Sequence, residues 1–129
     1  MEKLVLTLVR KMQEVELIDV AGVINKCTLR ELTGTERDKY LSSMSSRMKY
    51  DAKGKPIGIK SFDGLQAALL ERTLYDSDDN LVEKAVIQEY PSSTLQALYE
   101  ASQKLSALDE KAEDDAKNAS PASDSSGSE

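Results

Sequence analysis

Apolar residues recur at helical spacing in several parts of the chain, most clearly toward its end. Between residues 93 and 108 they fall on one helical face: Leu95, Leu98, Tyr99, Leu105 and Leu108. Ser93 and Gln96 have the spacing of a capping box, with Pro91 just upstream. The pattern predicts a helix that begins near Ser93.

Two further helices are predicted upstream. Asn80 and Glu83 have capping spacing, and the apolar face that follows must end where Tyr90 precedes Pro91, so this helix is short. The stretch Ser61–Tyr75 is rich in good helix formers and is apolar on most sides. We expect it to be the central buried helix.

A fourth helix is predicted from the segment Thr33-Gly34-Thr35-Glu36, which reads as a capping box and opens an apolar face that continues to about residue 50. Residues 51–60 contain two Gly and one Pro, which predicts a loop. We expect Ile57 and Ile59 to hold this loop against the body.

In the N-terminal part of the chain, the residue pattern changes from helix-like to strand-like. Residues 15–20 and 27–32 look like strands, with turn material at Gly22 and at Asn25-Lys26, whereas 4–12 fits either a strand or a helix. The preferred fold is therefore mainly α, with about four helices and a small N-terminal β-hairpin (α+β); the alternative is all-α. A lone two-stranded ribbon is marginally stable, so we expect another subunit or a client to complete its edge.

Charge divides the chain near Leu108. Beyond it there is no Leu, Ile, Val, Met or aromatic residue, and seven acidic residues face two lysines. Since such a segment buries too little apolar surface to offset its ordering entropy, we predict a helix-rich domain over 1–108 and a disordered acidic Ser/Ala-rich tail over 109–129. The total charge is −6, so the body is nearly neutral and has no basic stripe for nucleic acid.

The residue types that usually carry catalysis are scarce. The chain has no His, no Trp and one Cys, Cys27, which we interpret as structural. The run 76–80 resembles a calcium loop but has Leu81 and Ile87 where that loop requires Gly and Glu, and we read it as a polar turn. We expect no catalytic residues, no metal and no cofactor. The longest apolar stretch, 4–9, is too short to span a membrane or to export the chain.

Several short blocks occur in a suggestive order: Thr28–Thr33 (TLRELT), Tyr40-Leu41, Phe62–Leu70 (FDGLQAALL), Leu74–Asp76 (LYD) and Pro91–Leu98 (PSSTLQAL). Together they resemble the tail assembly chaperones of long-tailed, lambdoid phages. The resemblance implies a host-cytoplasmic, non-enzymatic protein that binds the tape measure protein during virion morphogenesis and is absent from the mature virion. It also implies recruitment of the tail tube protein, in this family often through a longer, frameshifted product.

We expect partner binding to involve the second strand and the central helix, through Leu29, Leu32, Phe62, Leu65, Leu69 and Leu70. The chaperone role further predicts a homo-oligomer, because many weak copies along one long client act by avidity. The alternative function is a small cytoplasmic adaptor or regulatory protein-binding module.

Overall fold

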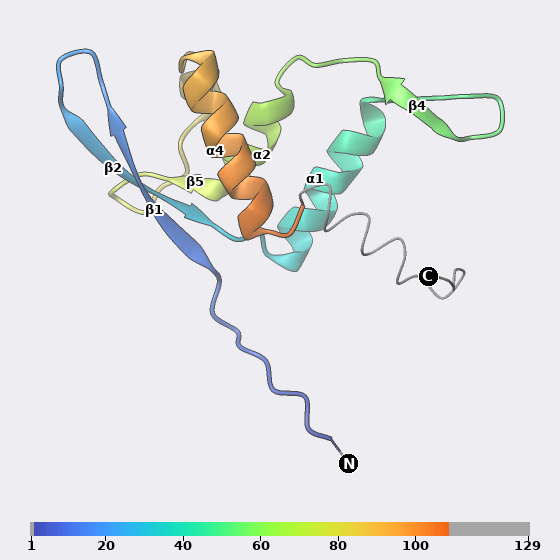
Figure 1. Ribbon diagram of the computed structural model, residues 1–129, viewed down its shortest axis with the longest axis horizontal. Helices are drawn as coiled ribbons and strands as arrows, with labels where there is room; N and C mark the ends of the chain where they lie inside the picture. Colours follow the sequence, from blue (N-terminus) through green and yellow to red (C-terminus); the bar gives the residue numbers. More distant parts are fainter. Residues whose placement is uncertain (1, 109–129) are drawn as a thin grey trace.

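The computed structural model describes residues 2–108, and over this range it has five β-strands and four α-helices. The strands form two antiparallel sheets, one of three strands and one of two (Figure 1). The fold is therefore α+β, and the prediction of a mainly α fold is wrong. Three of the strands are short and lie where the sequence predicts helix ends or a loop. Residues 74–75 pair with the distant residues 28–29, whereas residues 48–50 and 56–59 pair with each other across the expected loop.

The predicted N-terminal hairpin is present. Strands β1 (Met12–Ile18) and β2 (Ile24–Arg30) pair in an antiparallel register that joins Val15 to Cys27. The turn lies earlier than predicted: the Asp19 carboxylate accepts bonds from the backbone N–H groups of residues 21 and 23, and Gly22 has a φ of 82°. Residues 25 and 26 belong to β2. Strand β5 (Leu74–Tyr75) pairs with β2, so this chain itself supplies a third strand.

Helix α1 (Gly34–Ser46) begins as predicted, with both hydrogen bonds of the Thr33–Glu36 capping box. It ends earlier than predicted, because β3 (Met48–Tyr50) pairs with β4 (Pro56–Ile59). The expected loop is thus a second hairpin, which projects from the body (Figure 1). Ile57 is 65% exposed, so it does not hold the hairpin against the body.

Helix α2 (Leu65–Thr73) lies at the centre of the fold, as expected, with five of its side chains buried. It is shorter than the predicted 61–75 segment. Its N-cap is Gly64, in the left-handed conformation, and no side chain caps the first turn. Glycine fits this position because a side chain at a φ of 68° is strained.

The two remaining helices are α3 (Lys84–Ile87) and α4 (Ser92–Leu105). Helix α3 is short, as predicted, but it begins after Glu83 and not at residue 80. Helix α4 follows Pro91 directly and has no side-chain cap, so the predicted Ser93–Gln96 capping box does not form. The helix itself is present, because its apolar face packs against α2 and the sheet.

Two apolar clusters fill the interior. The first joins β2, α2, β5, α3 and α4 and contains Cys27, Leu29, Ala67, Leu70, Leu74, Ile87 and Leu98. The second lies between α1, α2 and the end of the domain and contains Leu32, Tyr40, Ala68, Leu69 and Leu108. Leu108 is the last described residue and is 2% exposed. The predicted tail, 109–129, lies outside the described residues.

Candidate functional site

The residues expected to bind partners lie mostly inside the domain. Leu29, Leu69 and Leu70 are fully buried, and Leu32 is 7% exposed. Leu29 and Leu70 belong to the first apolar cluster, and Leu32 and Leu69 belong to the second. These four side chains pack against this chain's own core, so as placed they offer little surface to a partner.

The other two expected residues lie near the start of α2. Leu65 is half-buried at its first turn, and Phe62 is 70% exposed before the helix begins. Phe62 is thus the one member of the predicted set with a largely free side chain. The main concave surface of the described domain lies elsewhere.

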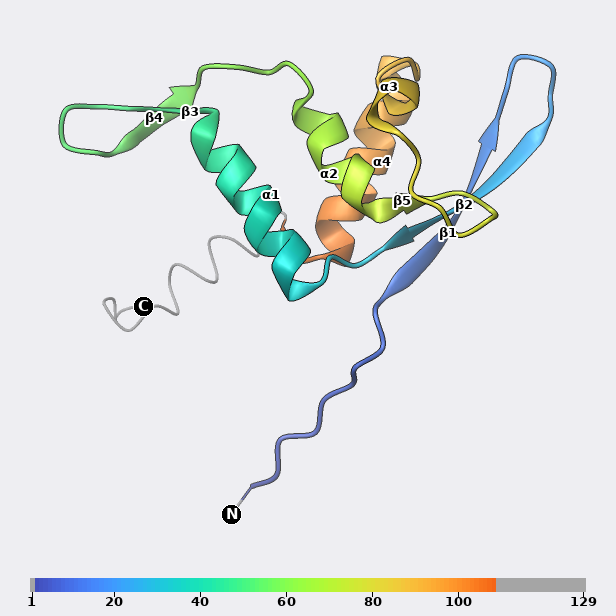
Figure 2. The ribbon, with the colours of Figure 1, turned by 180° about the vertical axis from the view of Figure 1, so that it is seen from behind.

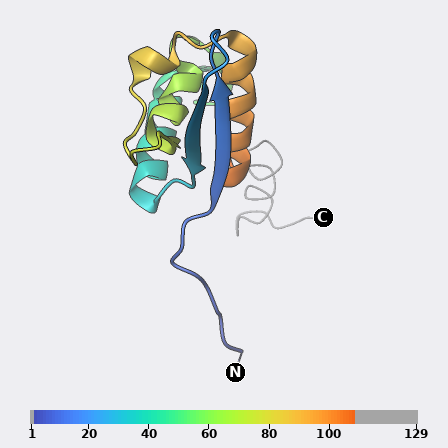
Figure 3. The same ribbon diagram turned by 90° about the vertical axis from the view of Figure 1, so that its left-hand side faces the viewer.

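An open groove runs between the β1–β2 hairpin and the helices α3 and α4, with a volume of about 1380 Å³. The upper half of the hairpin stands away from the helices, as Figures 1 and 2 show. Seen from the hairpin side, β1 lies between β2 and α4 (Figure 3). The groove is therefore walled by a strand on one side and by helices on the other.

Apolar side chains line the groove without being fully covered. Val15 and Leu17 alternate along β1 and point inward, and on the opposite wall Val82 and Tyr90 pack against the same core cluster. Val86 on α3 is 49% exposed. An uncovered apolar concavity of this kind is a common feature of protein interaction sites.

The charges around the groove have one sign. Six of its lining residues are acidic and none is basic: Glu14, Glu16, Asp19, Asp76, Glu83 and Glu89. Asp19, Asp76, Glu83 and Glu89 come from the hairpin turn, the turn after β5 and the neighbourhood of α3. Glu14 and Glu16 alternate with the inward-pointing Val15 and Leu17 on β1, so their side chains lie on its exposed face at the rim. The groove thus suits a partner whose apolar surface is flanked by Lys or Arg.

Cys27 and Tyr90 also line the groove. Burial, and secondarily the charge of Asp76, raises the pKa of the Cys27 thiol above its ordinary value of 9.0. Burial, and secondarily Cys27, raises the pKa of the Tyr90 phenol above 10.0. A protonated thiol is a poor nucleophile and a poor metal ligand, so Cys27 acts here as a small apolar side chain.

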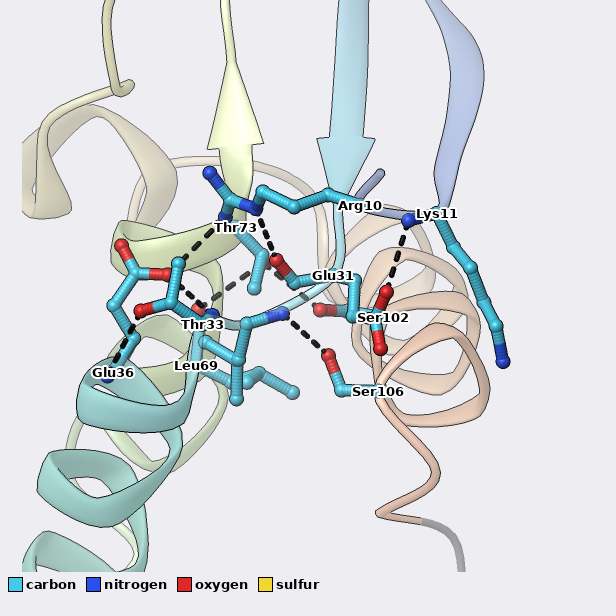
Figure 4. Close-up of polar contacts among 10 residues, drawn as sticks. Arg10, Lys11, Glu31, Thr33, Glu36, Leu69, Thr73, Ser102 and Ser106 are labelled. Atoms are coloured by element: carbon cyan, nitrogen blue, oxygen red, sulfur yellow. Dashed lines mark hydrogen bonds and ion pairs between the residues drawn. The ribbon is translucent and has the colours of Figure 1, made fainter. Parts of the chain in front are cut away.

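The lower end of the hairpin is fixed by polar contacts (Figure 4). The Arg10 guanidinium donates to the Glu31 carbonyl at 2.7 Å and to the Glu36 carboxylate at 3.1 Å. The Lys11 N–H donates to the Glu31 carboxylate at 2.9 Å, and the Lys11 carbonyl accepts from the Glu31 N–H at 2.8 Å. These bonds join the first residues of the hairpin to the start of α1.

The other flank of the sheet is held by Arg30. Its guanidinium carbon lies 4.0 Å from the centre of the Tyr75 ring, and the group also pairs with Asp79. Cation–π contacts of this kind stabilise neighbouring elements modestly. They tie β2 to β5 and to the following turn, which fixes one wall of the groove.

The acidic run 76–80 is the polar turn that we predicted. One oxygen of the Asp76 carboxylate accepts the backbone N–H groups of residues 78 and 80, and Tyr75 pairs with Leu81 in an isolated bridge. Asp79 takes a positive φ of 65°, which this residue type tolerates. Within residues 2–108, no group of three potential metal-binding side chains is found.

Comparison with family models, curated proteins and solved structures found no match to this chain. Among the residues that the structure describes, no helix is long and apolar enough to cross a membrane. The groove is therefore the feature from which function must be argued. Sequence patterns missed it because its acids come from two segments, 14–19 and 76–89, which are far apart in the sequence and which only the fold brings together.

Proposed function

We propose that this protein is a non-enzymatic tail assembly chaperone of a long-tailed phage, acting in the host cytoplasm. It would bind the tape measure protein during tail morphogenesis, help to recruit tail tube subunits, and be absent from the mature virion. The proposal rests on the sequence blocks that resemble this family and on one structural observation. That observation is the open, apolar, acid-lined groove.

The groove suits a helical client for a physical reason. A long helix with an apolar stripe aggregates unless the stripe is covered, and a groove lined by aliphatic and aromatic side chains accepts such a stripe. Val82, Val86 and Tyr90 offer this surface on one wall. The acids at its rim would pair with basic residues beside the client's stripe, which favours correct orientation and rapid association.

The proposal is tested by measuring binding to purified fragments of a tape measure protein from a long-tailed phage. Val86→Asp places a charge on the apolar wall of the groove, and Ile57→Asp is the matched control, because Ile57 is also an exposed β-branched residue but lies on the distant β3–β4 hairpin. We expect Val86→Asp to weaken binding at least about tenfold, since burying an uncompensated carboxylate is costly, and Ile57→Asp to bind like the wild type.

The readout is isothermal calorimetry or fluorescence anisotropy, with circular dichroism to show that each variant is folded. A wild-type protein that bound no tape measure fragment would overturn the proposed function. Equal weakening by both variants would place the client outside the groove.

A further inference from the structure

The first residues of the chain form an extended apolar arm, which we define as residues 2–9. Its five aliphatic side chains are strongly exposed: Leu4 82%, Val5 78%, Leu6 79%, Leu8 102% and Val9 73%. In an extended strand, Leu4, Leu6 and Leu8 lie on one face and the two valines on the other. So much exposed aliphatic surface on one short segment indicates a surface that is normally covered.

The arm does not reach the groove of its own chain. It leaves the lower end of β1 and runs away from the domain (Figure 1). To turn back along β1 it would have to reverse at Arg10 and Lys11, whose bonds to Glu31 and Glu36 hold them in place (Figure 4). The arm is thus directed outward, toward another molecule.

The groove offers a complementary edge. Within the described residues β1 pairs with β2 on one side and with no strand on the other. Beside this free edge lies α4, which presents the small side chains of Ala97 and Ala101 to the main groove and to a smaller groove of about 440 Å³ at the base of β1. An added strand would find backbone partners on β1 and room above α4.

We infer that the occupant is the arm of a second copy of this chain, paired with β1 and directing Leu4, Leu6 and Leu8 into the groove. Such pairing would extend the three-stranded sheet by one strand. The leucines would then share the inward face with Val15 and Leu17. Two copies can exchange arms reciprocally, which closes the assembly as a symmetric dimer.

Charge favours this occupant. Arg10 is already paired with Glu36 of its own chain, so the arm offers Lys3 near its start and Lys11 at its root, against a single acid, Glu2. The main groove is lined by six acids and no basic residue, whereas the smaller groove is lined by Lys11, Lys104 and Glu100. The basic ends of the apolar run thus match the acidic rim of the main groove. The acidic segment 109–129 carries the opposite charge pattern and would be repelled.

The area is also sufficient. Full burial of a Leu side chain removes roughly 60–120 Å² from water, so the six inward-facing leucines of two arms account for roughly 360–720 Å². The groove surfaces that they cover add a comparable area. The total, roughly 720–1,440 Å², reaches the lower part of the range of about 1,200–2,000 Å² that is typical of stable protein interfaces.

The experiment is sedimentation equilibrium of the full chain without any client, so its outcome is independent of the proposed chaperone function. The arm variant combines Leu4→Asp, Leu6→Asp and Leu8→Asp; the groove variant combines Ala97→Arg and Ala101→Arg; and Ile57→Asp is the control. We expect wild type and control to dimerise. The arm and groove variants should self-associate at least about a hundredfold more weakly while keeping the wild-type circular dichroism spectrum.

Mixing the two defective variants tests the pairing directly. The groove variant keeps an intact arm and the arm variant keeps an intact groove, so the mixture should form a heterodimer held by one arm. A dye on one variant makes this species visible in sedimentation velocity. A wild-type monomer at high concentration, an arm variant that still dimerises, or a mixture that stays monomeric would each overturn the inference.

Discussion

At the scale of single residues, two buried hydroxyl groups join the central helices. Ser102 Oγ on α4 donates to Thr73 Oγ1 at 2.9 Å, and Thr73 Oγ1 donates to the Leu69 carbonyl of α2 at 3.1 Å (Figure 4). Both residues are fully buried. Each hydroxyl thus has a hydrogen-bond partner inside the core. Ser102 donates in this pair, whereas Thr73 both accepts from Ser102 and donates to the Leu69 carbonyl.

This difference predicts unequal costs of substitution. Thr73→Val removes the acceptor and leaves the buried Ser102 hydroxyl without its partner, which should lower the free energy of unfolding by about 1–3 kcal/mol. Ser102→Ala leaves the bond from Thr73 to the Leu69 carbonyl intact and should cost about 1 kcal/mol. Urea denaturation measures both. A larger loss for Ser102→Ala would contradict the donor assignment.

The raised pKa values of Cys27 and Tyr90 predict how stability changes in alkali. When folding raises the pKa of an acid, its stabilising contribution is complete below the unfolded pKa and is lost as pH rises above it. For Cys27 this loss begins near its ordinary value of 9.0, and for Tyr90 near 10.0. The free energy of unfolding should therefore begin to fall near pH 9 through Cys27 and fall further above pH 10 through Tyr90.

The control for this pH dependence is Cys27→Ala, which removes the thiol and also its effect on Tyr90. Its free energy of unfolding should be lower than that of wild type at pH 8 but should fall less steeply toward pH 10. Chemical denaturation at a series of pH values gives the two slopes. Equal slopes would show that Cys27 is not responsible.

At the scale of elements, two of the three helix starts that the sequence marks with capping spacing differ in the structure. Thr33 Oγ1 accepts from the Glu36 N–H at 3.2 Å, and the Glu36 carboxylate accepts from the Thr33 N–H at 2.9 Å. At α4 the N-cap is Pro91, and Ser93 lies inside the first turn without a capping bond. The same sequence spacing therefore gives a cap in one helix only.

Alanine substitution should separate the two positions. Thr33→Ala is expected to lower the free energy of unfolding by about 1 kcal/mol, whereas Ser93→Ala, at an exposed site without a cap, should change it by less than about 0.5 kcal/mol. Thermal or urea denaturation provides the comparison. Losses of similar size would mean that Ser93 does cap α4 in solution.

Local patterns predicted the elements whose signals lie close together in sequence. The hairpin, the capped start of α1 and the central burial of α2 were all predicted in this way. The β3–β4 hairpin and the two-residue β5 were not: the Gly and Pro residues of 51–60 indicated only a loop, and β5 depends on pairing with the distant β2. Two-residue strands have no periodicity that a sequence window can detect.

The candidate site was harder to predict than the fold. Leu29, Leu69 and Leu70 were predicted to bind partners, but they are fully buried. Apolar character alone does not distinguish a core position from a binding position. The groove is instead lined by side chains from β1, α3 and α4 that are only partly covered. The sequence does show that an apolar run precedes two basic residues in the arm. This run can be recognised as an exposed arm only once the start of β1 at Met12 is known.

At the scale of the whole molecule, one groove serves both proposals. The arm of a second copy and the apolar stripe of a tape measure helix would cover the same aliphatic surface between β1 and α4, and both would place basic residues near the same acids. Occupation by one therefore excludes the other. On these proposals, self-association would protect the groove when no client is present, and a client would release it.

This exclusion predicts competition. Adding a saturating tape measure fragment to the proposed wild-type dimer should shift the protein to a one-to-one complex with the fragment, because both ligands would fill the apolar space between the β1–β2 hairpin and the helices. Size-exclusion chromatography with light scattering measures the mass of each species. The arm variant, already monomeric, should bind the fragment more tightly than wild type, since no dimer has to dissociate first. A client that bound the intact dimer without changing its stoichiometry would show that the client and the arm occupy separate surfaces.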